Sequence, residues 1–216
     1  MTGLQGAGLA LAYLIGAVPI GLVVGLALGT DPRKVGSGNI GATNVLRALG
    51  PGVGVAVFIA DVLKGVAAVA LCAALGIEGI LLSMAALFVA LGHCFSVFIG
   101  FKGGKGVATS LGAVLMLSPI AAGIAFAVWL LTMLPTRMVS LASLLGAVTL
   151  PVAFYLLNTA TPEDVVPLVA MVIVVMGRHH ENIERLLRGE ENRFGSSRKA
   201  EGEDAAAQER TDTEEA

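Results

Sequence analysis

Residues 107–134 read VATSLGAVLMLSPIAAGIAFAVWLLTML and contain no charged side chain. A helix needs about 20 apolar residues to cross the ~30 Å hydrocarbon core of a membrane. A stretch of 28 residues therefore suits either one long tilted helix or two short ones. Pro119 lies near its middle, where a proline ends or kinks a helix. The choice decides how many times the chain crosses the membrane and on which side it ends.

The distribution of basic residues favours two helices. Lys and Arg are enriched in the cytoplasmic loops of membrane proteins. Bases occur in the segments 30–50, 100–106 and 135–137, and again from residue 178 onward. All of these can lie on one side only if the chain reverses near Ser118–Pro119. We therefore predict seven transmembrane helices, with the N-terminus outside and the C-terminus cytoplasmic. Six helices is the alternative, and it would place the last basic segment on the opposite face.

The rest of the chain also indicates an all-α, polytopic membrane protein. Hydrophobic residues make up 56% of it and charged residues 14%, whereas about a quarter of a soluble domain is charged. The other apolar runs are at 5–28, 52–74, 79–99 and 138–157, with a shorter one at 164–177. The first run has no basic segment before it and is long enough to span, so we expect a transmembrane helix there and not a cleaved signal peptide.

The C-terminal residues have a different composition. Residues 200–216 hold seven of the sixteen acids and one of the fourteen bases. The preceding residues carry nine acids and thirteen bases, so the membrane body is basic. An acidic segment with little apolar bulk does not fold by itself. We predict a membrane domain at 1–195 and a disordered cytoplasmic tail at 196–216.

Three polar segments combine glycines with hydrogen-bonding and cationic groups. The first, at residues 36–47, reads GSGNIGATNVLR. Glycines let backbone N–H groups turn toward an anion, and the start of a helix adds a positive dipole. Its candidate phosphate-binding residues are Gly36, Gly38, Asn39, Thr43 and Asn44, and its candidate catalytic residues are Ser37 and Arg47. The embedded G-x-G-x-x-G is a weak signal because a membrane helix precedes it instead of a strand. A simple polar turn is the alternative.

The second segment, at residues 92–109, reads GHCFSVFIGFKGGKGVAT. It lacks the spacing of a nucleotide-binding P-loop, but two lysines in a glycine-rich loop suit a phosphate group. Candidate phosphate-binding residues are Lys102, Gly103 and Gly104, and Lys105 is a candidate catalytic residue. Positive-inside anchoring would explain the lysines but not the glycines. We interpret His93, at an apolar helix end, as a packing residue.

The third segment, at residues 177–194, reads GRHHENIERLLRGEENRF and continues the last helix out of the membrane. His179 and Asn182 are candidate catalytic residues, and their spacing of three places them on one helix face. We also predict a pair between Glu181 and Arg185, four residues apart. An interfacial amphipathic helix is the alternative reading of this segment.

One further pair lies inside the second apolar run. Asp61 and Lys64 are three residues apart, share a helix face and are predicted to pair. Ionisable groups in a membrane helix are costly and face partners or water. A structural pair is the first interpretation, and direct contact with a substrate is the alternative.

Taken together, the three segments resemble the acyl-phosphate:glycerol 3-phosphate acyltransferases, the PlsY family. The resemblance is carried by SGNIGATNVLR at 37–47, GFKGGKGVATSLG at 100–112 and RHHENIERLLRGEENRFG at 178–195. Ile40 departs from the family pattern, in which proline often follows the asparagine. The resemblance implies a seven-helix fold in the bacterial inner (cytoplasmic) membrane, with an active site facing the cytoplasm. It also implies transfer of a fatty acyl group from acyl phosphate to the 1-hydroxyl of sn-glycerol 3-phosphate, the first acylation of phospholipid biosynthesis. The products are lysophosphatidate and phosphate.

The resemblance also implies roles for the candidate residues. The polar residues of the first segment would bind phosphate or orient substrate, and Lys102 and Lys105 would neutralise phosphate charge. His179 and Asn182 would orient glycerol phosphate or its hydroxyl. Either His179 or a substrate phosphate would accept the proton. We expect no metal, no cofactor and no nucleic acid partner; the partners are the two substrates and membrane lipid, and no oligomer is required.

Two other functions fit parts of the pattern. A transporter of an organic anion would use a helix broken at Pro119. Its site belongs near the middle of the membrane, whereas the polar segments here gather on one side. A scaffolding membrane protein would not need basic glycine loops.

Overall fold

The computed structural model describes residues 2–157 and 161–195, and it is helical in every regular element of these ranges. The elements are α1 (Gly3–Ala17), α2 (Ile20–Ala27), η1 (Pro32–Lys34), α3 (Ala42–Leu49), α4 (Pro51–Ala74), α5 (Ile80–Cys94), η2 (Val97–Ile99), α6 (Val107–Leu117), α7 (Pro119–Thr136), α8 (Val139–Leu157), α9 (Pro162–Gly177) and α10 (His180–Arg188). The all-α prediction is confirmed for these ranges. The predicted acidic tail at 196–216 lies outside the described residues.

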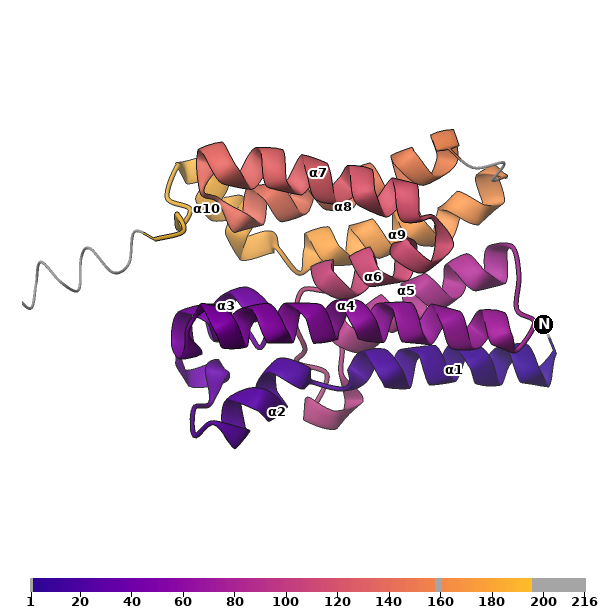
Figure 1. Ribbon diagram of the computed structural model, residues 1–216, viewed down its shortest axis with the longest axis horizontal. Coiled ribbons are helices and arrows are strands. Elements are labelled where there is room, and N and C mark those ends of the chain that lie inside the picture. The colour runs from indigo at the N-terminus through magenta and orange to yellow at the C-terminus, as the bar shows by residue number, and fades with distance from the viewer. Residues whose placement is uncertain (1, 158–160, 196–216) are drawn as a thin grey trace, which may run out of the picture.

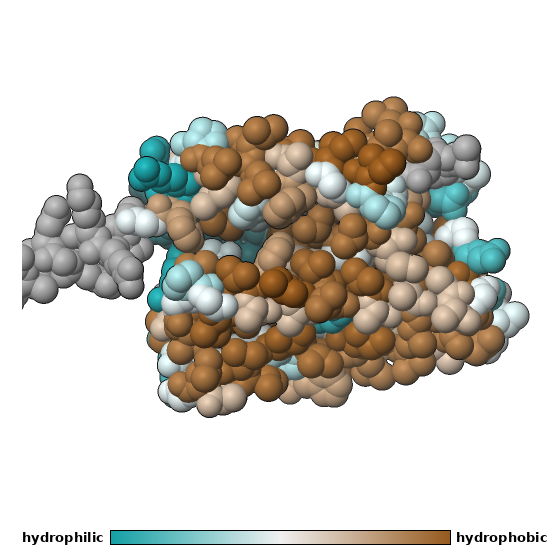
Figure 2. All heavy atoms as spheres, in the orientation of Figure 1, coloured by the Kyte–Doolittle hydropathy of each residue, from teal (hydrophilic) through white to brown (hydrophobic). Residues whose placement is uncertain are grey.

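The described helices have the length and surface of a membrane protein. Five stretches are long and apolar enough to cross a membrane: Gly3–Ala27, Pro51–Ala74, Ile80–Ile99, Pro119–Thr136 and Val139–Leu157. The apolar α6 is shorter. Figure 2 shows a broad hydrophobic surface between two more hydrophilic ends. The N-terminus lies at one of these ends, and α3 and α10 lie at the other (Figure 1). The protein is therefore a membrane protein, with its polar segments gathered at one end.

The predicted break at Ser118–Pro119 is confirmed. Ser118 has an extended backbone, with φ of −154°, and Pro119 is the first residue of α7, where its missing N–H costs nothing. α6 begins directly after the Lys105 loop. α7 ends at Thr136, and the carbonyl of the next residue, Arg137, accepts a hydrogen bond of 2.7 Å from the Phe194 amide. Lys105 and Phe194 both lie at the α10 end, so α6 and α7 form a hairpin.

A second break was not predicted. The sequence indicates one apolar run at 5–28, but the structure ends α1 at Ala17 and begins α2 at Ile20. Val18 has ψ of 115°, which is outside the helical range, because the ring of Pro19 disfavours a helical conformation in the residue before it. The Val18 carbonyl therefore makes no hydrogen bond within a continuing helix, and it accepts one from Lys64 Nζ instead.

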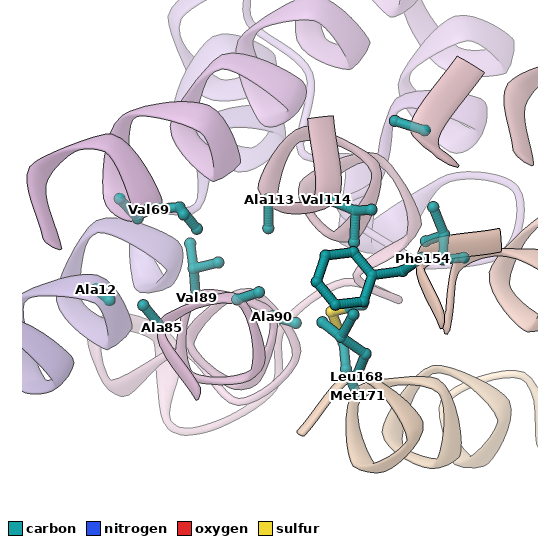
Figure 3. Close-up of a cluster of buried hydrophobic side chains, with 14 of the residues drawn as sticks. Ala12, Val69, Ala85, Val89, Ala90, Ala113, Val114, Phe154, Leu168 and Met171 are labelled. Carbon is teal, nitrogen blue, oxygen red and sulfur yellow. The ribbon is translucent and has the colours of Figure 1, made fainter. Parts of the chain in front are cut away.

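The core is built from small side chains that let the helices approach closely. α5 lies in the middle and packs against α1, α4, α6 and α9. Ala12, Ala85, Ala90 and Ala113 are completely buried among these helices (Figure 3). Where α8 meets α9, larger residues fill the space, and the ring of Phe154 lies beside the α9 side chains in Figure 3. This packing holds the ends of α4, α5, α6 and α9 around the polar segments.

Candidate active site

A cavity of about 150 Å³ lies where the three polar segments meet. All five residues predicted to be catalytic line it: Ser37, Arg47, Lys105, His179 and Asn182. So do three of the predicted phosphate-binding residues, Asn39, Thr43 and Asn44. Gly36, Gly38, Lys102, Gly103 and Gly104 are not part of the lining. The structure thus brings together residues that are up to 145 positions apart in the chain.

Asn44 shapes the first segment. It is almost completely buried, and its amide nitrogen donates to the carbonyls of Pro32 at 2.8 Å, Val35 at 3.0 Å and Asn39 at 2.8 Å. Its amide oxygen accepts a hydrogen bond of 2.9 Å from the Ser37 amide. Because both ends of the side chain are bound to backbone, Asn44 organises the loop that presents Ser37 and Asn39 to the cavity.

The glycines of this segment have a conformational role. Gly36 and Gly38 have φ of 58° and 67°, in the left-handed region that glycine adopts without a steric penalty. They allow the loop to fold around the Asn44 side chain. α3 then begins at Ala42 and carries Thr43 and Arg47, which are four residues apart and share a face.

The glycines of the second segment are also used by the fold. The Gly103 amide donates to the Cys94 carbonyl at 3.1 Å, and the Gly104 amide donates to the His93 carbonyl at 3.0 Å. Arg178 donates to the carbonyls of Gly103 at 2.8 Å and Gly104 at 3.1 Å. A Cβ atom on Gly104 would collide with the His93 ring. These backbone groups therefore hold the loop in place and do not face the cavity.

Of the two lysines in this loop, only Lys105 belongs to the cavity, and Lys102 is exposed. The Lys105 ammonium donates to the side-chain oxygen of Asn182. Asn182 in turn donates to Glu191 at 2.8 Å, and Arg185 donates to the second Glu191 oxygen at 3.1 Å. Burial lowers the pKa of Lys105 to about 8, although Glu191 acts to raise it. The cation is thus held by hydrogen bonds in a partly dry site.

Glu191 is a residue that the sequence did not reveal. Helical spacing pairs Arg185 with Glu181, but the structure pairs it with Glu191. α10 ends at Arg188, and the left-handed conformation of the next residue, Gly189, with φ of 74°, turns the chain back toward the helix. Glu191 therefore reaches Asn182 and Arg185 through a reversal of the chain, and no helical period describes that contact.

His179 is buried, and its two ring nitrogens are differently placed. Its Nδ1 lies 2.8 Å from the Val175 carbonyl, which can only accept, so Nδ1 carries the proton. Nε2 is then an acceptor. Burial lowers the pKa of His179 to about 4, so the ring is neutral near pH 7. The His179 ring that lines the cavity is therefore a neutral hydrogen-bonding group and not a further cation.

Several other side chains line the cavity from the membrane helices. Asp61 and His93 face it from α4 and α5, and Asp61 pairs with Lys64 at 2.7 Å as predicted. Trp129 of α7 lines it as well, and its ring nitrogen donates to the Ser143 hydroxyl at 3.3 Å. Of these residues, the sequence singled out Asp61 as one of a buried pair and indicated a packing role for His93, but it gave no sign that Trp129 or Ser143 lies at the cavity.

A smaller apolar pocket of about 30 Å³ adjoins this cavity. The two share Phe58, Val107 and Trp129 in their linings. The other apolar residues of the small pocket include Leu111, Phe126 and Leu150. A ligand with a charged head and an apolar chain would thus find both environments side by side. Within residues 2–157 and 161–195, no group of three or more His, Cys, Asp or Glu side chains is placed to hold a metal ion.

The fold is that of a helical membrane protein, and its cavity brings cationic side chains together with hydrogen-bonding groups. The sequence profile of the family described as glycerol-3-phosphate acyltransferase matches residues 7–189. Relatives named glycerol-3-phosphate acyltransferase include one from Rubrobacter xylanophilus, 45% identical over 86% of this chain and 92% of its own. Another, from Thermus thermophilus, is 46% identical over 87% of this chain and 94% of its own.

Two solved structures are similar to this chain as well. The glycerol 3-phosphate form of PlsY (YgiH), an integral membrane glycerol 3-phosphate acyltransferase, has a TM-score of 0.85 and 41% identity. That match covers 91% of this chain and 98% of that one. The lysophosphatidic acid form has a TM-score of 0.83 and 40% identity, over 90% and 97% of the two chains. The chain belongs to the glycerol-3-phosphate acyltransferase family and is an acyltransferase.

The role of Asn44 can be tested with a substitution that keeps its shape. In Asn44→Asp, a carboxylate oxygen replaces the nitrogen that donates to three carbonyls. We expect the free energy of unfolding to fall by more than about 3 kcal/mol, because hydrogen bonds become repulsive contacts at a buried site. Thermal unfolding in detergent measures it. Asn39→Asp is the matched control, since Asn39 uses its side-chain oxygen to accept from the Gly41 amide and a carboxylate preserves that bond. Equal unfolding midpoints for the two variants would contradict the assignment.

Proposed function

We propose that this acyltransferase moves a fatty acyl group from acyl phosphate to the 1-hydroxyl of sn-glycerol 3-phosphate. The observation that carries the proposal is the cavity that unites Arg47 and Lys105, and also Arg185, with hydrogen-bonding groups beside an apolar pocket. Both substrates carry phosphate, and one carries an acyl chain. The family match and the relatives' shared name support the acceptor, and the apolar pocket supports a donor with a long chain.

The chemistry proposed is a direct displacement. The 1-hydroxyl oxygen attacks the carbonyl carbon of acyl phosphate, and the bond from that carbon to the phosphate oxygen breaks. The phosphate leaves with the electron pair. Lys105 and Arg47 neutralise phosphate charge, and Ser37 and Asn39 orient the phosphate groups from the loop that Asn44 shapes. The enzyme contributes orientation and electrostatic stabilisation, which are large terms in acyl transfer.

The state of His179 favours one of the two bases considered. A ring with a pKa of about 4 is neutral but only weakly basic, whereas a general base works best with a pKa near the operating pH. A phosphate group has its second pKa near 6 and is a stronger base. We assign proton uptake to a substrate phosphate oxygen. His179 Nε2 accepts a hydrogen bond that orients the attacking hydroxyl.

The same proposal includes the topology. Counting α1 and α2 as one crossing, α4 to α9 supply six more, which gives seven helices with the N-terminus outside and the C-terminus cytoplasmic. The cavity then faces the cytoplasm of a bacterial cell, where glycerol 3-phosphate is made, and the protein lies in the inner membrane. Residues 1–195 form the membrane domain, with the acidic tail following it on the cytoplasmic side.

Cysteine labelling tests this topology. In a chain whose two buried cysteines are replaced by alanine, single cysteines are placed at Lys34, Leu187 and Glu78. We expect an impermeant maleimide to label Glu78→Cys in intact cells, and to label Lys34→Cys and Leu187→Cys only after the membrane is opened. Labelling of Lys34→Cys and Leu187→Cys from opposite sides would contradict seven crossings.

The activity itself is tested with purified protein in detergent. We expect labelled glycerol 3-phosphate and palmitoyl phosphate to give lysophosphatidate, and palmitoyl-CoA to give none. Arg47→Ala and Lys105→Ala should each lower kcat/KM by about 100-fold or more, because each removes a charge aimed at phosphate. Lys34→Ala, an exposed base outside the cavity, is the control. Full activity in the Arg47 and Lys105 variants would overturn the proposal.

The lowered pKa of Lys105 predicts that the enzyme loses activity at alkaline pH. The ammonium form is present below about pH 8 and is lost above it, and kcat/KM reports the free enzyme. We expect kcat/KM to fall above about pH 8 in the wild-type protein. In Lys105→Arg, whose guanidinium does not deprotonate in this range, the residual kcat/KM should stay flat to pH 9.5. A decline of the same shape in both proteins would assign the limit to another group.

A further inference from the structure

A buried ion pair inside the membrane helices has no part in the proposed chemistry. Asp61 and Lys64 of α4 pair at 2.7 Å, and their side chains are 3% and 7% exposed. Burying charges at such a position costs free energy, and charged residues found there usually have a structural or functional partner. What the pair contacts indicates what it does.

The pair joins three elements. Lys64 Nζ donates at 3.1 Å to the Val18 carbonyl, which is the group released by the break between α1 and α2. Asp61 Oδ1 lies 3.6 Å from Nδ1 of His93 on α5. The hydroxyl of Thr109, in the first turns of α6, lies 3.1 Å from the same nitrogen. His93 Nδ1 is thus in hydrogen-bond range of Thr109 on α6 and lies next to the Asp61 carboxylate of α4.

His93 in turn packs directly against the loop that carries Lys105. Its ring lies against Gly104, where a Cβ atom would collide with Nε2, and its carbonyl accepts from the Gly104 amide. Thr109 follows Lys105 by four residues, after the left-handed Gly106 that begins α6. The ring therefore contacts the chain immediately before Lys105 and soon after it.

We propose that Asp61, His93 and Thr109 form a positioning network that sets where the Lys105 ammonium lies in the cavity. These residues act through Lys105 and are not themselves assigned contact with the reacting atoms. The inference rests on the proposed function for its kinetic consequence, but the placement of Lys105 is a property of the protein alone.

The network can be broken without disturbing shape. Thr109→Val removes the hydroxyl and keeps the volume, and Thr109→Ser, which keeps the hydroxyl, is its matched control. The double variant Asp61→Leu with Lys64→Met removes both charges at once, because replacing a whole buried ion pair by apolar groups is commonly tolerated. Each is compared with the wild-type protein by thermal unfolding before kinetics are measured.

A double-mutant cycle separates positioning from general destabilisation. We expect Thr109→Val and the Asp61/Lys64 variant to lower kcat/KM by about 10- to 100-fold, as expected when a reacting group is displaced by about 1 Å. In the Lys105→Ala background the same changes should cost less than about twofold, since the residue they position is gone. Thr109→Ser should retain most of the rate. Equal losses in both backgrounds would overturn the proposal.

A second readout does not depend on activity. The pH at which an amine-specific reagent half-labels Lys105, measured by mass spectrometry, reports its pKa, which is about 8 in the intact site. The charges that act on it are those of Glu191, Arg185, Glu181 and Arg178, and none of these is changed. We expect the midpoint to rise in Thr109→Val and in the Asp61/Lys64 variant as Lys105 leaves its buried place. An unchanged midpoint would overturn the inference even if acyl transfer is observed. A raised midpoint without acyl transfer in the wild-type protein would refute only the proposed function.

Discussion

The contact between the Lys105 ammonium and the Asn182 side chain is the interaction on which the site depends. It joins the glycine loop before α6 to α10, and it is continued by the hydrogen bond from Asn182 to Glu191. A buried cation next to a buried carboxylate would form a tight ion pair, which would leave little charge for a ligand. The Asn182 amide lies between them: it accepts a hydrogen bond from Lys105 and donates one to Glu191, and so keeps the two charges apart. Lys105 therefore remains a cation that a phosphate can use.

Two side chains, Asn44 and Arg178, hold the loops by their backbone groups. Asn44 binds three carbonyls and one amide of the first segment. Arg178 binds the carbonyls of the second segment and lies over the Phe95 ring at 5.7 Å. Because such polar groups are satisfied within the protein, loop backbone can exist at the edge of a membrane bundle. The glycines are needed for this backbone packing, which explains why several lie outside the cavity that their pattern predicts.

The sequence predicted the helical hairpin at Pro119 because two independent signals agreed there, the proline and the charge on either side. At Pro19 only the proline was available, and the break was missed. The gathering of Ser37, Arg47, Lys105 and His179 followed from placing all basic segments on one side. The sequence did not show that Lys105 lines the cavity and Lys102 does not, because this depends on the direction in which a glycine loop turns. The contacts of Glu191 with Asn182 and Arg185 depend on the chain reversal at Gly189, which helical spacing does not predict.

In the proposed mechanism, the lowered pKa of His179 leaves proton uptake to a substrate phosphate. Burial just after the end of α9 keeps the ring neutral at the cost of basicity, and the hydrogen bond from Nδ1 to the Val175 carbonyl leaves Nε2 as an acceptor. A protonated histidine beside Lys105 would instead compete for the same phosphate and repel the lysine. Acyl phosphate has a good leaving group, so the difficult requirements are to align a hydroxyl and to hold two anions together. In the proposed arrangement the cations of the cavity lie on the phosphates and a neutral acceptor faces the hydroxyl, which is the distribution of charge that the proposed reaction needs.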